Sequence, residues 1–207
     1  LKPELEDRFK YWRDQLEKGE LDKFAPDDVE VFKKLASTGF ENLKTTEFKH
    51  AGIWRLQFNQ LRSFRPSRNA SRVIESISEA FNPEGFHFNK PFLQKEVFWQ
   101  GEIFDKKFKL LYNKFPFASL HGLLLIEPEA EKAQFLDKSS HDLIWRLLEE
   151  HAARLPMGAG YNAMGGFASV NHQHFQTFVS RKKYPVELAC WDHNGGNLHY
   201  PVNCKKL

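Results

Sequence analysis

The order of strand-like and helix-like segments in the second half of the chain limits the folds that it can adopt. Residues 96–104 (EVFWQGEIF) and 108–117 (FKLLYNKFPF) predict paired strands, or a strand and its lead-in. Residues 119–129 (SLHGLLLIEPE) predict a buried strand that Pro128 ends. Residues 138–156 predict a helix, with Ser139 or Ser140 as its N-cap. Neighbouring strands with one long intervening helix favour an α+β fold over a doubly wound sheet.

The first fifty residues show helical rather than strand periodicity. Leu5, Phe9, Trp12 and Leu16 share one face of a predicted helix that stops at Gly19. Residues 25–37 (APDDVEVFKKLAS) predict a second helix, and residues 52–58 (GIWRLQF) a strand. We therefore expect a helical N-terminal extension over residues 1–50 and one α+β domain over residues 51–207.

The composition excludes several classes of protein. The chain has 207 residues and a formal charge of +3, which does not indicate a partner that is a nucleic acid polymer but is compatible with small phosphate-bearing molecules. The longest apolar run, residues 123–126, is far too short to span a membrane. Cys190 and Cys204 do not make a disulfide framework. We expect an intracellular, cytoplasmic protein.

Two histidines and a glutamine alternate in residues 168–178 (ASVNHQHFQTF). If this stretch is a strand, His172, His174 and Gln176 share one face, because successive side chains of a strand point to opposite faces. Three interpretations are open. The histidines could be buried structural groups, or zinc or iron ligands completed by His87, His121 or a glutamate. Alternatively, a neutral imidazole could attack a phosphorus atom and form a nucleotidyl-histidine.

The residues before this pattern favour the phosphorus chemistry. Gly165 and Gly166 would allow the backbone to approach a phosphate, and Asn162 and Ser169 offer polar side chains. Upstream, residues 59–72 predict a loop that carries four arginines, which either bind phosphate oxygens or form a solvated basic surface. These arginines are Arg62, Arg65, Arg68 and Arg72.

These motifs together resemble a known superfamily. Residues 171–178 (NHQHFQTF) resemble the active-site strand of the transferase branch of the histidine-triad superfamily, whose motif is His-x-His-x-Gln. Residues 160–178 are similar to the signature of the GDP-hexose phosphorylases within that branch. Residues 113–128 and 59–66 resemble the strand pair and a basic segment that precede this signature. The resemblance implies a histidine-triad-like antiparallel sheet with packed helices.

The resemblance also implies roles for individual residues. His174 would be the nucleophile, His172 would orient the site and contact phosphate, and Gln176 would hydrogen-bond the nucleotidyl intermediate. Asn162 and Ser169 would hold phosphate or ribose oxygens, and Arg65 would help to neutralise charge. Asn113 and His121 lie in the matching upstream segment and are candidate substrate contacts.

The implied reaction is a double displacement on a nucleoside diphosphate hexose. His174 takes the nucleoside monophosphate and expels hexose 1-phosphate, and inorganic phosphate then releases a nucleoside diphosphate. The resemblance implies no metal and no cofactor, and a homodimer that forms through the sheets. Two alternatives remain, a dinucleoside polyphosphate phosphorylase and a nucleotide-binding module without turnover. A metal-dependent enzyme is a third.

Overall fold

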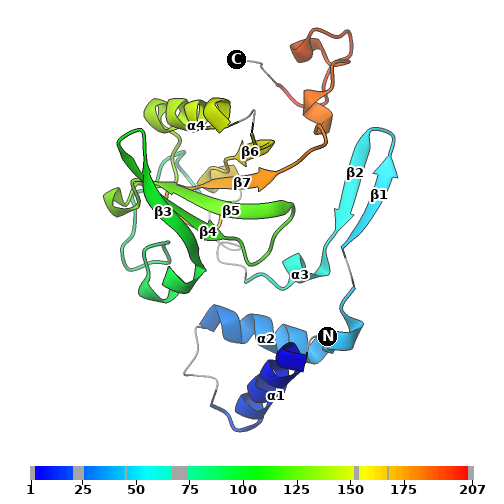
Figure 1. Cartoon of the computed structure of the whole chain (residues 1–207), viewed down its shortest axis with the longest axis vertical. Helices are drawn as coiled ribbons and strands as arrows, with labels where there is room; N and C mark the ends of the chain where they lie inside the picture. The colour runs from blue at the N-terminus through cyan, green and yellow to red at the C-terminus, as the bar shows by residue number, and fades with distance from the viewer. Residues whose placement is uncertain are drawn as a thin grey trace.

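The computed structural model describes residues 3–20, 26–44, 46–66, 74–151, 154–166 and 168–204. Its centre is an antiparallel sheet of five strands in the order β3-β4-β5-β7-β6 (Figure 1). The strands are β3 (Val97–Ile103), β4 (Lys106–Tyr112), β5 (Ser119–Ile126), β6 (Met157–Gly160) and β7 (Phe175–Val179). Helix α4 (Lys138–His151) joins β5 to β6 in the sequence. The predicted α+β class is confirmed.

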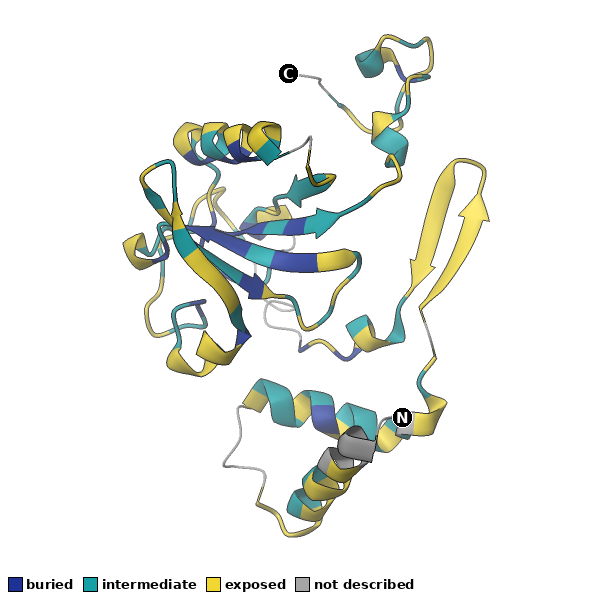
Figure 2. Ribbon diagram, viewed as in Figure 1, coloured by how far each residue is buried: buried dark blue, intermediate teal, exposed yellow. Residues whose placement is uncertain are grey.

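Both faces of this sheet are apolar along β5, where successive side chains enter core clusters on opposite faces. Leu124 and Ile126 pack with Ile144 and Leu147 of α4 in one core cluster. Leu125 belongs to a second cluster on the opposite face, where segments outside the sheet cover it. Phe88, Leu93, Leu111 and Val170 are the other buried members of that cluster. Figure 2 shows β5 buried along most of its length.

The hairpin from β3 to β4 confirms the predicted strand pair. Ile103 pairs with Lys106 across a two-residue turn. Phe104 and Asp105 have φ angles of 52° and 57°, the left-handed values that a type I′ turn requires at both positions. The Arg146 guanidinium of α4 lies 3.8 Å from the centre of the Phe104 ring and covers this turn.

The N-terminal part contains two helices and a separate hairpin. Helix α1 (Pro3–Glu17) ends before Gly19, as predicted, and Trp12 contacts Phe32 of α2 (Pro26–Thr38) at 5.2 Å between ring centroids. A 3-10 turn (Phe40–Asn42) follows. Strand β1 (Glu47–Ala51), which the sequence did not predict, pairs with the predicted β2 (Trp54–Phe58). The boundary predicted between residues 50 and 51 falls inside β1, and the division into two domains stays a prediction.

Three local predictions were wrong. Residues 60–63, expected in a loop, form the one-turn helix α3 (Gln60–Ser63), capped by the side chain of Asn59. Helix α4 begins at Lys138, and Asp137 caps it instead of a serine, because the Asp137 Oδ1 atom accepts the Ser140 N–H at 2.7 Å. Strand β7 begins at Phe175, so His172 and His174 lie on the segment that leads into it.

Short 3-10 turns complete the described chain, at Pro91–Glu96, Pro128–Ala130, Met164–Gly166, Pro185–Glu187 and Asp192–Asn194. Among the helices of the described residues, none combines the length and the apolar character that crossing a membrane would require.

Candidate active site

His174 is held in one tautomer next to a large cavity. Its Nδ1 atom lies 2.7 Å from the carbonyl oxygen of His172. Because a carbonyl can only accept a hydrogen bond, Nδ1 carries the proton and Nε2 keeps its lone pair. The residue is 7% exposed and lines the cavity, and the edge of its ring meets Phe88 at 4.9 Å between centroids.

His172 is more deeply buried and does not line this cavity. Its side chain is 1% exposed, and its Nδ1 atom accepts the backbone N–H of Phe88 at 3.1 Å. A hydrogen bond with the Pro128 backbone engages the imidazole further. The ring stacks on Phe88 at 5.9 Å. His172 therefore orients the site in this structure, and the phosphate contact that the resemblance implies stays a prediction.

Burial keeps these imidazoles neutral. Loss of hydration is the main cause that lowers the pKa of His174 to about 4; the hydrogen bond to His172 opposes it, and the positive charge of Arg65 adds to it. Burial likewise lowers the pKa of His172 to about 4. The lone pair of a neutral imidazole is what nucleophilic attack requires.

Gln176 belongs to a chain of oriented hydrogen bonds. The Nδ1 atom of His121 accepts the Phe117 N–H at 3.2 Å, so its Nε2 atom carries the proton. Of the two side-chain atoms near Nε2, the Asn113 Nδ2 atom at 3.2 Å is itself a donor, so the proton goes to the Gln176 Oε1 atom at 3.1 Å. The Gln176 Nε2 atom then donates to the Asn162 Oδ1 atom at 2.9 Å. This direction presents the amide N–H groups of Gln176, and not its oxygen, on the side away from His121.

His121 supports this chain from behind the cavity wall. It is 4% exposed and is not among the residues that line the cavity. Burial, followed by the charge of Arg62, lowers its pKa to about 4. Asn113, which does line the cavity, donates its backbone N–H to the His121 carbonyl at 3.0 Å and holds this part of the β4–β5 connection.

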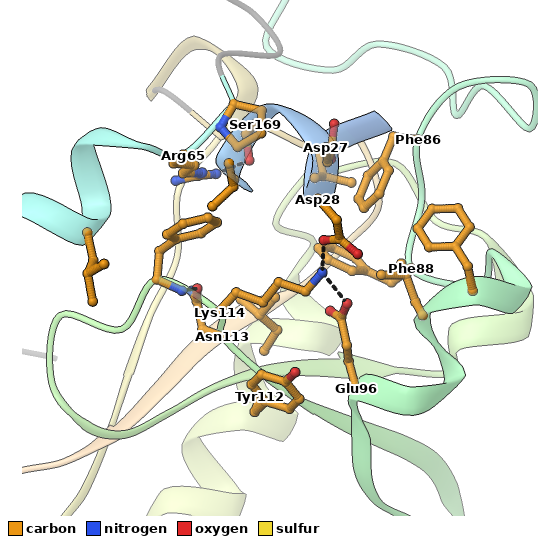
Figure 3. Close-up of a pocket in the computed structure, with 18 of the residues that line it drawn as sticks. Asp27, Asp28, Arg65, Phe86, Phe88, Glu96, Tyr112, Asn113, Lys114 and Ser169 are labelled. Atoms are coloured by element: carbon orange, nitrogen blue, oxygen red, sulfur yellow. Dashed lines mark hydrogen bonds and ion pairs between the residues drawn. The ribbon is translucent and has the colours of Figure 1, made fainter. Parts of the chain in front are cut away.

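The polar rim of the cavity contains three further predicted residues. Arg65 donates a hydrogen bond to the Ser169 hydroxyl, and both residues line the cavity (Figure 3). Asn162 lines it as well. Gly165 and Gly166 do not line it, and neither has a positive φ angle. Arg62 donates to the Phe115 carbonyl at 2.5 Å instead of facing solvent. Arg68 and Arg72 lie outside the described residues.

The whole cavity has a volume of about 490 Å³, and apart from this polar rim its lining is largely apolar. Its aromatic lining comes from the N-terminal helices, from residues 86–92 and from the end of β4. These side chains are Trp12, Phe32, Phe86, Phe88, Phe92, Tyr112 and Phe115. The sequence did not predict that the N-terminal helices contribute to the site, because their apolar faces also fit simple packing.

Lys114, which lines the cavity, forms ion pairs with two carboxylates that also line it. The Lys114 Nζ atom lies 2.8 Å from Asp28 Oδ1 and 2.8 Å from Glu96 Oε1 (Figure 3). Burial alone would lower the pKa of Lys114, but its two carboxylate partners outweigh that effect and raise it. Burial alone would raise the pKa of Asp28, but the hydrogen bonds and charges of Lys114 and, to a smaller extent, Lys95 outweigh that effect and lower it. Lys114 thereby joins α2 to the sheet domain.

A metal site finds little support in this geometry. His87, considered as a third ligand, has its ring 6.1 Å from that of His172. Its Nε2 atom lies 3.1 Å from the Pro83 carbonyl, and its Nδ1 atom accepts the Asn89 N–H. Across the part of the chain that the structure describes, no three His, Cys, Asp or Glu side chains are grouped so that they could hold a metal ion.

Comparisons with known proteins address the family. A family model described as GDPGP1-like, N-terminal domain, matches residues 51–178. GDP-D-glucose phosphorylase 1 from Macaca fascicularis is 31% identical over 143 residues, which are 64% of this chain and 36% of that protein. The Danio rerio protein of the same name is 27% identical over 162 residues, 70% of this chain and 46% of that one. The chain therefore spans less than half the length of these curated relatives.

Among solved structures, the crystal structure of yeast Ap4A phosphorylase Apa2 in complex with Ap4A is similar, with a TM-score of 0.45 and 16% identity. The match covers 88% of this chain and 60% of that chain. The family assignment rests on the sequence match, which runs from the last residue of β1 to the fourth residue of β7. By that match, this chain belongs to the GDPGP1-like family, and its residues 51–178 correspond to the N-terminal domain of that family.

Proposed function

We propose that this chain carries the nucleotidyl-transfer centre of a GDP-hexose phosphorylase. The observation that carries the proposal is the hydrogen bond from His174 Nδ1 to the His172 carbonyl, beside the cavity. It fixes the tautomer in which Nε2 is an unprotonated nucleophile. The names of the curated relatives supply the substrate class, because they are GDP-D-glucose phosphorylases.

The proposed reaction has two steps. In the first, the His174 Nε2 atom forms a bond to the α-phosphorus of the GDP-hexose, and the bond from that phosphorus to the bridging oxygen breaks. The departing group is hexose 1-phosphate, and GMP stays on His174. In the second, an oxygen of inorganic phosphate attacks the same phosphorus, the P–N bond breaks, and GDP leaves. In this proposal Gln176, Ser169 and Arg65, which line the cavity, donate hydrogen bonds to the phosphate oxygens as charge develops there.

We infer that the aromatic lining of the cavity binds the guanine base. The volume of about 490 Å³ lies in the range of pockets that hold small ligands. Flat rings at several angles offer stacking surfaces, and Phe92 is both in the lining and 48% exposed. Replacement Phe92→Ala should raise KM for GDP-glucose several-fold with little change in kcat. An unchanged KM would place the base elsewhere.

The experiment that tests the function is a phosphorus NMR time course of GDP-glucose with the protein. We expect GDP and glucose 1-phosphate to appear when inorganic phosphate is present, and neither to appear with a His174→Ala variant. Without added phosphate, intact-mass spectrometry should show one GMP bound per chain. No reaction of the wild-type protein, or full turnover by His174→Ala, would remove the proposal.

The same assay separates the alternatives. Equal turnover of a dinucleoside tetraphosphate would favour a dinucleoside polyphosphate phosphorylase, since that substrate has no sugar 1-phosphate to expel. Tight nucleotide binding without a phosphoramidate would favour a binding module. A cytoplasmic location and a homodimer are further proposals from the sequence. Light scattering after size-exclusion chromatography tests the dimer.

A further inference from the structure

A glutamine outside every sequence motif contacts the backbone of the proposed nucleophile. Gln134 lies on the connection between the Pro128–Ala130 turn and α4, and its side chain is 1% exposed. Its Oε1 atom accepts the backbone N–H of His174 at 2.8 Å. Its Nε2 atom donates to the His174 carbonyl at 3.2 Å and to the Asn162 carbonyl at 2.8 Å.

These contacts take the place of pairing with β6, which ends before it reaches His174. The last pair between β6 and β7 joins Gly160 to Gln176, and β7 itself begins at Phe175. The amide of Gln134 matches both backbone groups of His174, as a neighbouring strand would. The backbone of His174 is therefore held by one side chain, and not by the β ladder.

Gln134 is in turn fixed by the segment that it holds. Its backbone N–H donates to the Asn171 side chain at 2.9 Å, and its carbonyl accepts the Tyr161 hydroxyl at 2.9 Å. Next to His174 in the chain, the Gln173 N–H donates to the Lys132 carbonyl at 2.8 Å. Residues 132–134 and 171–174 thus bind each other through alternating backbone and side-chain groups, which leaves the Gln134 amide little freedom to move.

The same amide links the nucleophile to the phosphate-binding side chains. Asn162, whose carbonyl Gln134 holds, accepts the hydrogen bond from Gln176 through its own side chain. A displacement of Gln134 would change both the position of His174 and its distance from the Gln176 donor. The His174 Nδ1 bond to the His172 carbonyl spans only two residues, so its geometry depends on how this backbone is held.

We propose that Gln134 is a positioning residue, which sets the His174 imidazole in line for attack and keeps its tautomer. This proposal rests on the proposed function for its catalytic readout. Its physical core, the dependence of the His174 ring on the Gln134 amide, can be observed without turnover.

The test compares Gln134→Met, which keeps the shape and removes all three hydrogen bonds, with Gln173→Met. Gln173 is a matched control, because its side chain is also buried but bonds to Phe135 and Ser140 and not to His174. For Gln134→Met we expect kcat for GDP-glucose to fall about 100-fold, with KM nearly unchanged, since misplacement of a reacting group acts on rate. Gln173→Met should lower the melting temperature comparably and kcat far less.

Nitrogen-15 NMR of the histidine side chains gives the second readout. Wild-type His174 should show the Nδ1–H tautomer, and Gln134→Met should show a mixture of tautomers. If the wild-type protein does not turn over GDP-glucose, the proposed function fails and this spectrum still decides the role of Gln134. An unchanged His174 signal in Gln134→Met, or an equal loss of kcat in Gln173→Met, would overturn the proposal. Should Gln134→Met not fold, Gln134→Glu serves: its carboxyl, buried against two carbonyl oxygens, stays protonated, so the variant keeps the acceptor and one donor and loses the other donor.

Discussion

The proposed chemistry depends, at the residue scale, on a neutral His174. With a pKa of about 4, its imidazole stays unprotonated throughout the neutral range. We therefore expect kcat/KM for GDP-glucose to stay flat on the acid side between pH 8 and 6. This parameter reports the free enzyme and the first step alone, so the titration of inorganic phosphate does not enter. A fall with a midpoint near pH 6.5 would show that the nucleophile titrates as an ordinary histidine does.

The oriented amide of Gln176 leads to a second prediction. Gln176→Glu keeps an acceptor for His121 but removes the N–H donors that face Asn162 and the cavity. We expect kcat to fall about 100-fold, the usual effect of losing one donor to developing charge. The new carboxylate should also raise the pKa of His121 from about 4, which NMR titration measures.

Gln100→Glu offers a matched control, since it makes the same charge change at an exposed position on β3. If it reduces kcat as strongly as Gln176→Glu, then net charge, and not the direction of the amide, explains the loss.

The sequence identified the residues that touch the cavity better than those that support them. The alternating pattern predicted His174 and Gln176, and the glycine-rich segment predicted Asn162 and Ser169, all of which line it. Gln134 was missed because a single glutamine in a loop carries no periodic signal. Its role arises from a side chain that bonds to a distant backbone, and no local pattern encodes that contact.

At the scale of elements, the sequence predicted the central strands and α4 because their apolar residues follow the period of each structure. It placed His172 and His174 on a strand because alternation continues through them. In the structure the Gln134 side chain and the Lys132 carbonyl take the place of the neighbouring strand, so the ladder begins only at Phe175. Strand β1 was missed because residues 47–51 (EFKHA) lack the alternation of apolar and polar residues that indicated β2, although both strands are exposed throughout.

The attachment of α2 to the sheet domain gives a prediction at the same scale. Lys114→Met removes the ammonium group that joins Asp28 to the buried Glu96 (Figure 3). We expect the free energy of unfolding to fall by about 1–3 kcal/mol, because Glu96 is left buried without its charged partner. Guanidinium denaturation measures this change.

Lys95→Met is the control for that measurement. Lys95 also meets Asp28, at 3.4 Å, but its side chain is 61% exposed. An exposed pair of this kind contributes below about 1 kcal/mol. Equal losses in the two variants would mean that the link to Glu96 adds nothing beyond surface charge.

For the whole molecule, three buried histidines tie folding to pH. His121, His172 and His174 each have a pKa of about 4 when folded, against an ordinary value near 6.5. Between these values the unfolded chain binds more protons than the folded one, so the free energy of unfolding falls as pH falls. Carboxylates such as Asp28 and Asp137, whose pKa values are lowered, act below this window.

The expected loss is about 4 kcal/mol between pH 7.5 and 5.5, roughly 1.3 kcal/mol for each histidine. This is a large share of the 5–15 kcal/mol that typically stabilises a protein, so a marginally stable fold would begin to open near pH 5.5. Urea denaturation at both pH values measures the loss. In a His121→Asn variant, which retains a polar group and removes one titrating site, the loss should shrink by about a third. A stability that does not change with pH, or an identical loss in His121→Asn, would mean that these imidazoles gain their protons without unfolding. Either result would mean that the burial of these histidines does not make the fold sensitive to acid.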